Sequence, residues 1–188
     1  MLLLGVMLFS LIVGLARGGN LVAFGQHRWR FPFLPVLAVG MQVVGFLPDE
    51  SASGAARTFA AVLHILSYLL AFAFIWVNRR TPWLWLMAVG LVANAIVILA
   101  NGGFMPVSPE AVAGTPTAEV IGRGHYNNAV LMGTATRLWF LGDVLRTPRW
   151  LVPSRAFSIG DLTIAVAAFG LVQHLMRPLG PIRRRGTA

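Results

Sequence analysis

The sequence predicts an all-α fold, that of a polytopic integral membrane protein with about five transmembrane helices. Two observations support this prediction: 57% of the residues are hydrophobic and only 11% are charged, whereas soluble domains carry roughly 25% charged residues. Apolar stretches close to the length needed to cross a bilayer recur along the chain. Because backbone groups in a bilayer must bond within their own segment, the spans should be helices. We expect one membrane domain over residues 1–188.

Five segments are predicted to span the membrane: roughly 2–16, 31–48, 58–78, 82–100 and 158–176. The first is followed by Arg17 and lacks the basic leader and cleavage site of a signal peptide, so we expect it to be retained as a span. Pro48 ends the second, and Pro82 suits the start of the fourth. Asn101 and the two glycines after it end the fourth.

The charges predict an orientation in the inner (cell) membrane, with the amino terminus outside and the carboxyl terminus in the cytoplasm. In this arrangement the inner segments hold nine arginines and no acid: Arg17, Arg28, Arg30, Arg79, Arg80, Arg177, Arg183, Arg184 and Arg185. All six acids then lie on the outer side: Asp49, Glu50, Glu110, Glu119, Asp143 and Asp161. Positive residues in short loops favour the cytoplasmic side.

Composition also excludes some classes of function. The net charge of +9 comes from arginines that flank apolar runs, so we expect no nucleic-acid partner. The absence of cysteine excludes disulfides, thiolate metal sites and cysteine nucleophiles. We expect the lipid bilayer as a partner, a membrane protein as a candidate partner, and neither cofactor nor metal.

The long outer loop, residues 101–157, is where chemistry is expected. Its middle, residues 126–145, is apolar, and we predict a re-entrant or interfacial helix there because Arg137 disfavours a sixth span. The stretch "NGGFMPVSPE" is either a helix stop or a backbone-lined cradle, and "GHYNNAV" is either hydrogen-bonded loop or ligand contact. The candidate binding residues are Asn101, Gly102, Gly103, Met105, Pro106, Ser108, His125, Asn127, Asn128, Arg137, Ser158 and Gly160.

The candidate catalytic residues are two carboxylates, Asp143 and Asp161. Asp143 ends one apolar segment, and Asp161 lies at the start of another. Ser158 and Asp161 match a helix capping box, which alone would explain both. Asp143 is either exposed or paired with Arg137 or Arg146, and such a pair would lower the pKa of its carboxyl. If the two acids instead meet, they would share a proton, so that one acts as general base and the other as general acid.

Polar residues inside the predicted spans indicate packing between helices. His64 and Tyr68 share one face of the third span at spacing i, i+4, with Gln42 in the second span and Asn94 in the fourth. Such residues usually point into a helix bundle and hydrogen-bond across it. We therefore expect these four side chains to join helices.

Three motifs in the order "NGGFMPVS", "LGDV" and "FSIGDL" resemble an uncharacterised family of small bacterial integral membrane proteins, a domain of unknown function. This resemblance covers nearly the whole chain. It implies a bacterial multi-pass protein without implying an activity.

The stretch "FSIGDLTIAVAAFG" also resembles the closing motif of lipoprotein signal peptidases, in which an aspartate before the last span is catalytic. The resemblance implies a catalytic Asp161, with Ser158 at the position of that family's asparagine. "NGGFMP" is similar to the family's Asn-x-Gly-Ala-Ala-Phe stretch, but its Gly-Asn-x-x-Asp-Arg motif is missing. Asp143 as the second acid is inferred from "LGDV" only.

The sequence thus leaves open whether the protein is an enzyme. It predicts an integral membrane protein with a site on the extracytoplasmic face. A membrane-embedded aspartyl peptidase, a non-catalytic accessory subunit and a small solute- or lipid-binding permease are the competing functions.

Overall fold

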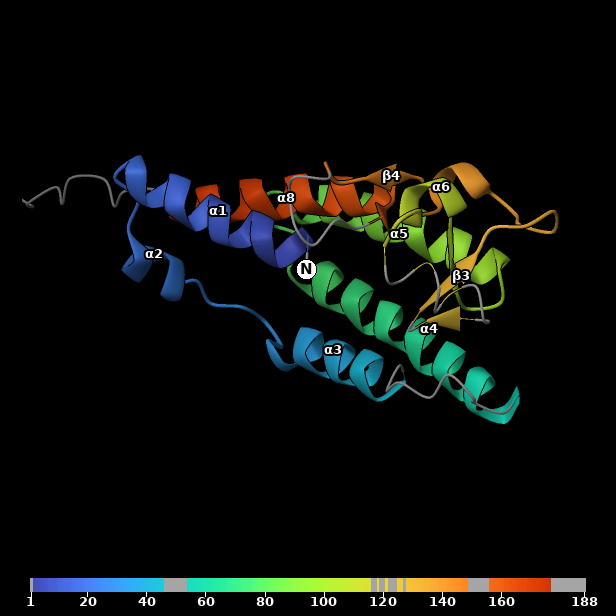
Figure 1. The fold of residues 1–188 in the computed structure, drawn as a ribbon. Helices are drawn as coiled ribbons and strands as arrows, with labels where there is room; N and C mark the ends of the chain where they lie inside the picture. Colours follow the sequence, from blue (N-terminus) through green and yellow to red (C-terminus); the bar gives the residue numbers. More distant parts are fainter. Residues whose placement is uncertain are drawn as a thin grey trace, which may run out of the picture.

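The computed structural model describes residues 2–45, 54–115, 118, 121, 125–126, 128–148 and 156–176. The described chain is mostly helical, with a small cap of short strands at one end (Figure 1). The longer helices are α1 (Leu2–Ala16), α3 (Phe33–Gly45), α4 (Gly54–Val77), α5 (Leu84–Ala100) and α8 (Ile159–Leu175). Two short helices, α2 (Leu21–Gly25) and α6 (Pro109–Val112), lie between them.

The five longer helices fall where the sequence predicts its five apolar segments, and the ends of α5 show the local chemistry that sets a boundary. The helix α5 begins after Pro82 and ends at Asn101, whose side chain amide donates to Val97 O at 2.7 Å. Gly102 and Gly103 follow with φ of 72° and 91°, the left-handed region that favours glycine at a helix end. That these helices cross a membrane stays a prediction.

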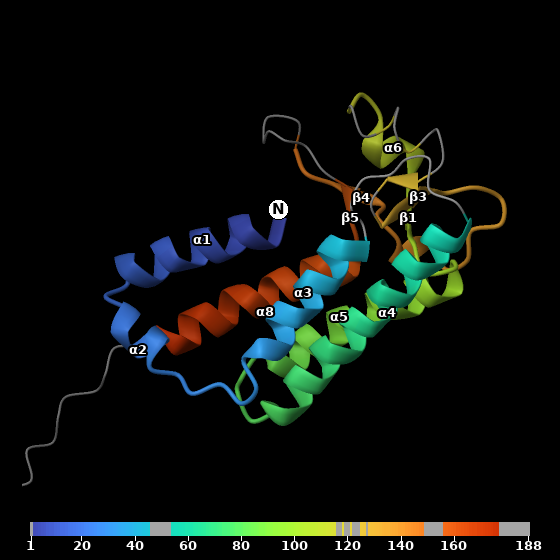
Figure 2. The ribbon, with the colours of Figure 1, turned by 90° about the horizontal axis from the view of Figure 1, so that it is seen from below.

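The helices pack in the spatial order α3, α4, α5, α8 and α1, each against the next. Figure 2 shows α8 between α1 and α5, and Figure 1 shows α4 between α3 and α5. The first and last long helices of the sequence are therefore neighbours. A hydrogen bond from Ser10 Oγ to Phe169 O at 2.9 Å joins them, as do two from Gln173 Nε2 to Ser10.

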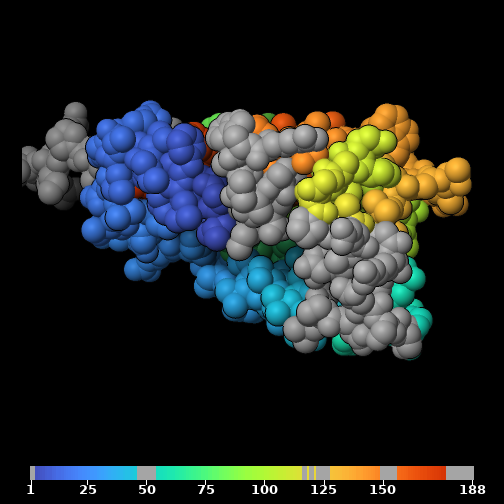
Figure 3. All heavy atoms as spheres, in the orientation of Figure 1, coloured from blue at the N-terminus to red at the C-terminus, as the bar shows by residue number. Residues whose placement is uncertain are grey.

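The cap contains β1 (Met105–Val107), β2 (His125–Tyr126), β3 (Ala129–Leu131), β4 (Leu145–Arg146) and β5 (Ala156–Phe157). The strand β3 pairs in parallel with β1 and antiparallel with β2, and β4 pairs antiparallel with β5. Residue Asp143 forms a further parallel bridge to Val107, on β1. In Figure 3 the yellow and orange cap residues gather at one end of the molecule.

The predicted re-entrant or interfacial helix over residues 126–145 is wrong. The described part of this segment contains β3 and a single 3-10 turn, Trp139–Leu141. The apolar run "AVL" pairs with the buried strand β1, so its hydrophobicity reflects a sheet and not a helix. The expectation failed because short apolar runs do not distinguish strand from helix.

One helix of the described chain, Gly54–Val77, is long and apolar enough to cross a membrane. Four shorter apolar helices accompany it: Leu3–Ala16, Phe33–Gly45, Leu84–Ala100 and Ile159–Leu175.

Candidate functional site

The predicted capping box at the start of α8 is confirmed. Ser158 is the N-cap residue, and its hydroxyl accepts a hydrogen bond from Asp161 N at 2.9 Å. In return, Ser158 N donates to Asp161 Oδ2 at 3.3 Å. The reciprocal bonds satisfy two backbone N–H groups that helix geometry leaves without partners. They also fix the Asp161 carboxylate at this end of the helix.

A neighbouring helix holds the same carboxylate from its other side. Asn94, on α5 and only 2% exposed, donates from Nδ2 to Asp161 Oδ1 at 2.7 Å and accepts from the Ser158 hydroxyl at 2.8 Å. Glycines allow this close approach: a Cβ at Gly160 would overlap the Asn94 amide, and one at Gly90 would lie 2.6 Å from Gly160 O. Asn94 therefore joins α5 to the first turn of α8.

Asp143 comes from the cap and is placed by its backbone. Its N–H donates to Pro106 O at 2.9 Å, and its carbonyl accepts from Ser108 N at 3.1 Å. These bonds align residue 143 beside β1, so that Val107 is its bridge partner. Gly142 permits the approach, because a Cβ there would lie 2.5 Å from Pro106 O.

The two carboxylates interact electrostatically. Burial, together with the nearby charge of Asp161, raises the pKa of the Asp143 carboxyl to about 7. Its Oδ1 atom is buried and has no hydrogen-bond partner among the residues that the structure describes. The alternative in which Arg137 or Arg146 pairs with Asp143 and lowers its pKa does not agree with this raised pKa, and Arg146 donates from Nη1 to Ala113 O.

A third helix contributes Tyr68, which lies on α4 beside the acids. Its side chain is in hydrogen-bond contact with Asn94 and interacts electrostatically with both Asp161 and Asp143. The ring of His64, one turn earlier, lies 5.4 Å from the Tyr68 ring. From the sequence, Tyr68 and Asn94 were expected only to pack helices together. The spacing of Tyr68 from His64 and the position of Asn94 inside a predicted span were the signals that could have identified them as site residues.

The glycine-rich stretch after α5 has a clear structural role. The Asn101 side chain donates to Arg137 O at 2.9 Å and accepts from Arg137 N at 3.0 Å, so it fastens the loop to the end of α5. Gly103 O lies 3.0 Å from His64 Nδ1, and a Cβ on Gly103 would overlap Ala61. These contacts explain Asn101, Gly102 and Gly103 as a helix end packed against α4. A ligand cradle there stays a prediction.

The other candidate binding residues are scattered through the cap. Met105 and Pro106 are buried in β1, and Asn128 contributes its carbonyl, which accepts from Met105 N at 2.6 Å. The Ser108 hydroxyl bonds the Glu110 carboxylate and lowers the pKa of Glu110. Only the backbone of His125, in β2, is described, and Asn127 lies outside the described residues.

The site that results is an acid pair with unequal surroundings. Asp161 accepts hydrogen bonds on both oxygens, whereas one buried oxygen of Asp143 has no partner within the described part of the chain. Groups whose surroundings differ in this way can divide acid and base roles, because one remains ionised while the other holds a proton near neutral pH. The described residues contain no cluster of three or more His, Asp or Glu side chains that could hold a metal ion.

Comparison with known proteins adds the family. Residues 27–173 match the family of unknown function DUF5317, and this range holds all the site residues described above. The chain belongs to this family. The predicted membership of an uncharacterised family is thus confirmed, whereas the three motifs and the likeness to lipoprotein signal peptidases stay predictions. No curated protein and no solved structure matches the DUF5317 chain.

Proposed function

We propose that this DUF5317 protein is a multi-pass membrane protein that uses Asp143 and Asp161 as a proton-exchanging acid pair on its extracytoplasmic face. The membrane part of the proposal is supported by an outward-facing apolar surface. Val36, Trp76 and Ile12 are 72%, 68% and 65% exposed. Soluble proteins rarely expose such continuous apolar surface.

The interior of the helices supports the same proposal. Buried polar side chains lie between them: Ser10, His64, Ser67 and Asn94. They bond across helices, as in the contact from Gln42 Nε2 to Ser67 Oγ at 2.9 Å. Polar side chains inside and large apolar ones outside suit helices that pack within lipid.

The unequal acid pair is the single observation that carries the chemical part of the proposal. With a pKa of about 7, the Asp143 carboxyl exchanges its proton near neutral pH, while Asn94 and Ser158 hold the Asp161 carboxylate. The distribution of arginines supports an orientation in which this end of the bundle lies outside the cytoplasm. The pair then takes up or releases one proton at the outer rim of the membrane.

Infrared difference spectroscopy of the protein in lipid nanodiscs tests this proposal. A protonated-carboxyl band should disappear with a midpoint near pH 7 and should be missing in Asp143→Asn. Asp161→Asn should lower the midpoint, because it removes a nearby negative charge. Glu110→Gln is a control that removes a fully exposed acid from the cap, and it should leave the band unchanged. A wild-type titration in the ordinary range of aspartate, near 4, would contradict the proposal.

Amide hydrolysis is a second candidate function, favoured by the two coupled carboxylates. A carboxylate that activates water and a protonated partner that supplies a proton to the leaving amine are the groups an aspartyl peptidase requires. The substrate class would be peptides that enter the bundle from the outer leaflet. An accessory subunit or a permease stays a prediction from the sequence.

A comparison of membrane proteomes tests hydrolysis. Cells with Asp143→Asn or Asp161→Asn should accumulate the same uncleaved precursors as cells without the protein. Ser158→Ala is the matched control, because it removes the cap hydroxyl and keeps both carboxyls. Precursors that accumulate equally in Ser158→Ala would show that folding, and not acid chemistry, was lost.

A further inference from the structure

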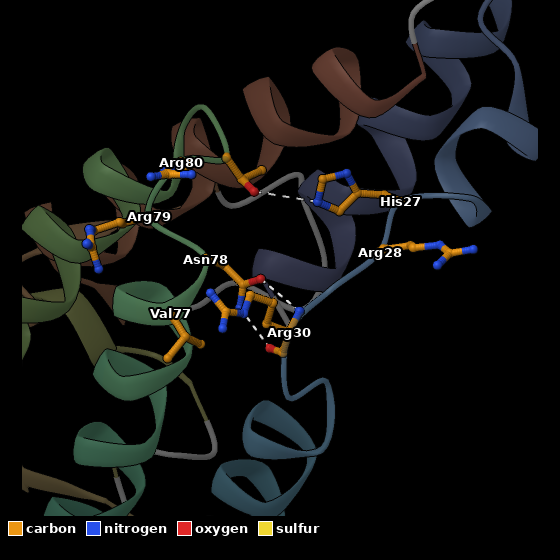
Figure 4. A pocket seen from close by; sticks show the side chains of 8 residues that line it. His27, Arg28, Arg30, Val77, Asn78, Arg79 and Arg80 are labelled. Carbon is orange, nitrogen blue, oxygen red and sulfur yellow. Dashed lines mark hydrogen bonds between the residues drawn. The ribbon is translucent and has the colours of Figure 1, made fainter.

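A pocket of about 330 Å³ lies where the segment between α2 and α3 meets the turn between α4 and α5 (Figure 4). Figure 2 places this turn at the end of the bundle away from the cap and its acid pair. Four arginines line the pocket: Arg28, Arg30, Arg79 and Arg80. None of the described residues that line it is acidic.

The pocket is built by specific bonds to a buried side chain. Asn78, 6% exposed, accepts from Arg30 N at 2.9 Å and donates from Nδ2 to Arg30 O at 2.9 Å and to Phe74 O at 2.9 Å. The two bonds to Arg30 fasten an irregular segment to the end of α4. Figure 4 shows Asn78 between the two segments. A second hydrogen bond joins them, between Thr81 Oγ1 and His27 Nε2 at 3.5 Å.

Asn78 bonds to the backbone of Arg30, and these two bonds form a clamp between the segments. The Arg30 guanidinium takes no part in this clamp. The Arg79 guanidinium donates to Trp76 O at 3.2 Å and lies 4.7 Å from the Trp76 ring centre. Like charges held close together repel, and an anion placed among them would offset that cost. The clamp therefore maintains a cationic pocket whose electrostatics favour a negatively charged ligand.

We propose that this pocket binds a phosphate group. The planar guanidinium fork matches the spacing of phosphate oxygens and donates to two of them at once, which a simple point charge does not. The volume is at the lower end of that of ligand pockets, enough for a phosphate with part of its ester substituent. The Trp76 ring, which lies against the Arg79 guanidinium, is 68% exposed and suits the headgroup level of a bilayer.

The phosphate has two sources that the same chemistry would accept: the headgroup of an anionic phospholipid, or free phosphate from solution. Thermal unfolding of the protein in neutral detergent distinguishes them. One arm adds phosphatidylglycerol to the micelles, with phosphatidylcholine as the neutral comparison. The other adds inorganic phosphate, with chloride at equal ionic strength.

The test variant is Arg30→Gln/Arg80→Gln, which removes two charges from the pocket. The matched control is Arg57→Gln/Arg137→Gln, which removes two charges from exposed positions outside the pocket. The wild type and the control should gain a higher Tm from one phosphate source, with an apparent affinity at least ~10-fold tighter than that of the pocket variant. Native mass spectrometry of bound phosphatidylglycerol, with Arg80→Gln alone, gives the same comparison if the double variant folds poorly.

A gain with phosphatidylglycerol alone supports a headgroup site, and a gain with inorganic phosphate supports a site for free phosphate. No gain in either arm overturns the proposal. An equal loss of response in the pocket and control variants also overturns it, because general charge attraction would then explain the binding. This test does not depend on the acid pair at the other end of the bundle.

Discussion

At the scale of single residues, Asp143 has the most informative surroundings. It is the acid whose pKa burial raises to about 7, from an ordinary value of 3.8. The folded protein therefore keeps a proton that the unfolded chain loses between about pH 4 and pH 7. Stability must fall as pH rises through that window, because the unfolded state releases its proton first.

Asp143→Asn should remove this loss, since an amide does not ionise. Its advantage over the wild type in free energy of unfolding should grow from pH 5 to pH 8 and reach a total of about 4 kcal/mol at the upper end, at ~1.4 kcal/mol per unit of pKa. Differential scanning fluorimetry in detergent measures both proteins across this range. A wild type that gains stability relative to Asp143→Asn as pH rises would show that the carboxylate has a favourable partner.

Substitution of Asp161 should destabilise the protein, whereas substitution of Asp143 should stabilise it. The reason is that the Asp161 carboxylate caps α8 and accepts a hydrogen bond from Asn94. Asp161→Asn should lower the Tm at pH 7, at a cost of about 1–3 kcal/mol for the bonds it disturbs. Ser158→Ala should cost a similar amount, since the same cap loses its hydroxyl. If both variants melted at the wild-type temperature, the result would contradict the hydrogen bonds of the cap.

At the scale of elements, the close contact of α5 with α8 positions the site. Gly160→Ala should separate the two helices, because the new Cβ would overlap Asn94, and overpacking of this kind costs typically ~1–3 kcal/mol. Gly40→Ala is the matched control: nothing lies within 4 Å of its new Cβ, and alanine is the better helix former. The Tm should fall for Gly160→Ala and should hold or rise for Gly40→Ala. A fall of equal size in both would show that α5 and α8 do not depend on glycine contact.

The sequence predicted the helices more reliably than the cap. The apolar segments and the capping box at Ser158 and Asp161 depend on local chemistry, which is readable from neighbouring residues. The pairing of β1 with β3 joins residues more than twenty positions apart, so no local signal announced it. Asp143 comes near Asp161 through a second long-range contact, its bridge to Val107 on β1. The sequence could therefore offer the interaction of the two acids only as one alternative.

At the scale of the whole molecule, helix length bears on the membrane proposal. The 17 residues of α5 and of α8 extend about 25 Å at 1.5 Å per residue, short of the roughly 30 Å of a bilayer's hydrocarbon core. Bilayers thin around short spans at modest cost. Among the helices that the structure describes, only the 24-residue α4 exceeds the full thickness.

The orientation of the molecule can be tested directly because the chain has no cysteine. A single Ala135→Cys places a thiol in the cap, and a single Gln26→Cys places one at the arginine-rich end, both at exposed positions. If short basic segments lie in the cytoplasm, a membrane-impermeant maleimide should label Ala135→Cys in intact cells. Gln26→Cys should be labelled only after the membrane is permeabilised.

The two thiols control for each other, since each variant carries one reactive group in the same background. The reverse pattern would place the acid pair in the cytoplasm, and the proposed exchange of protons at the outer rim would then fail. The phosphate pocket would move to the outer side with the arginines that line it. Labelling of both positions in intact cells would contradict a bundle that separates its two ends by a bilayer, and would leave the apolar helix surfaces to be covered by other protein chains.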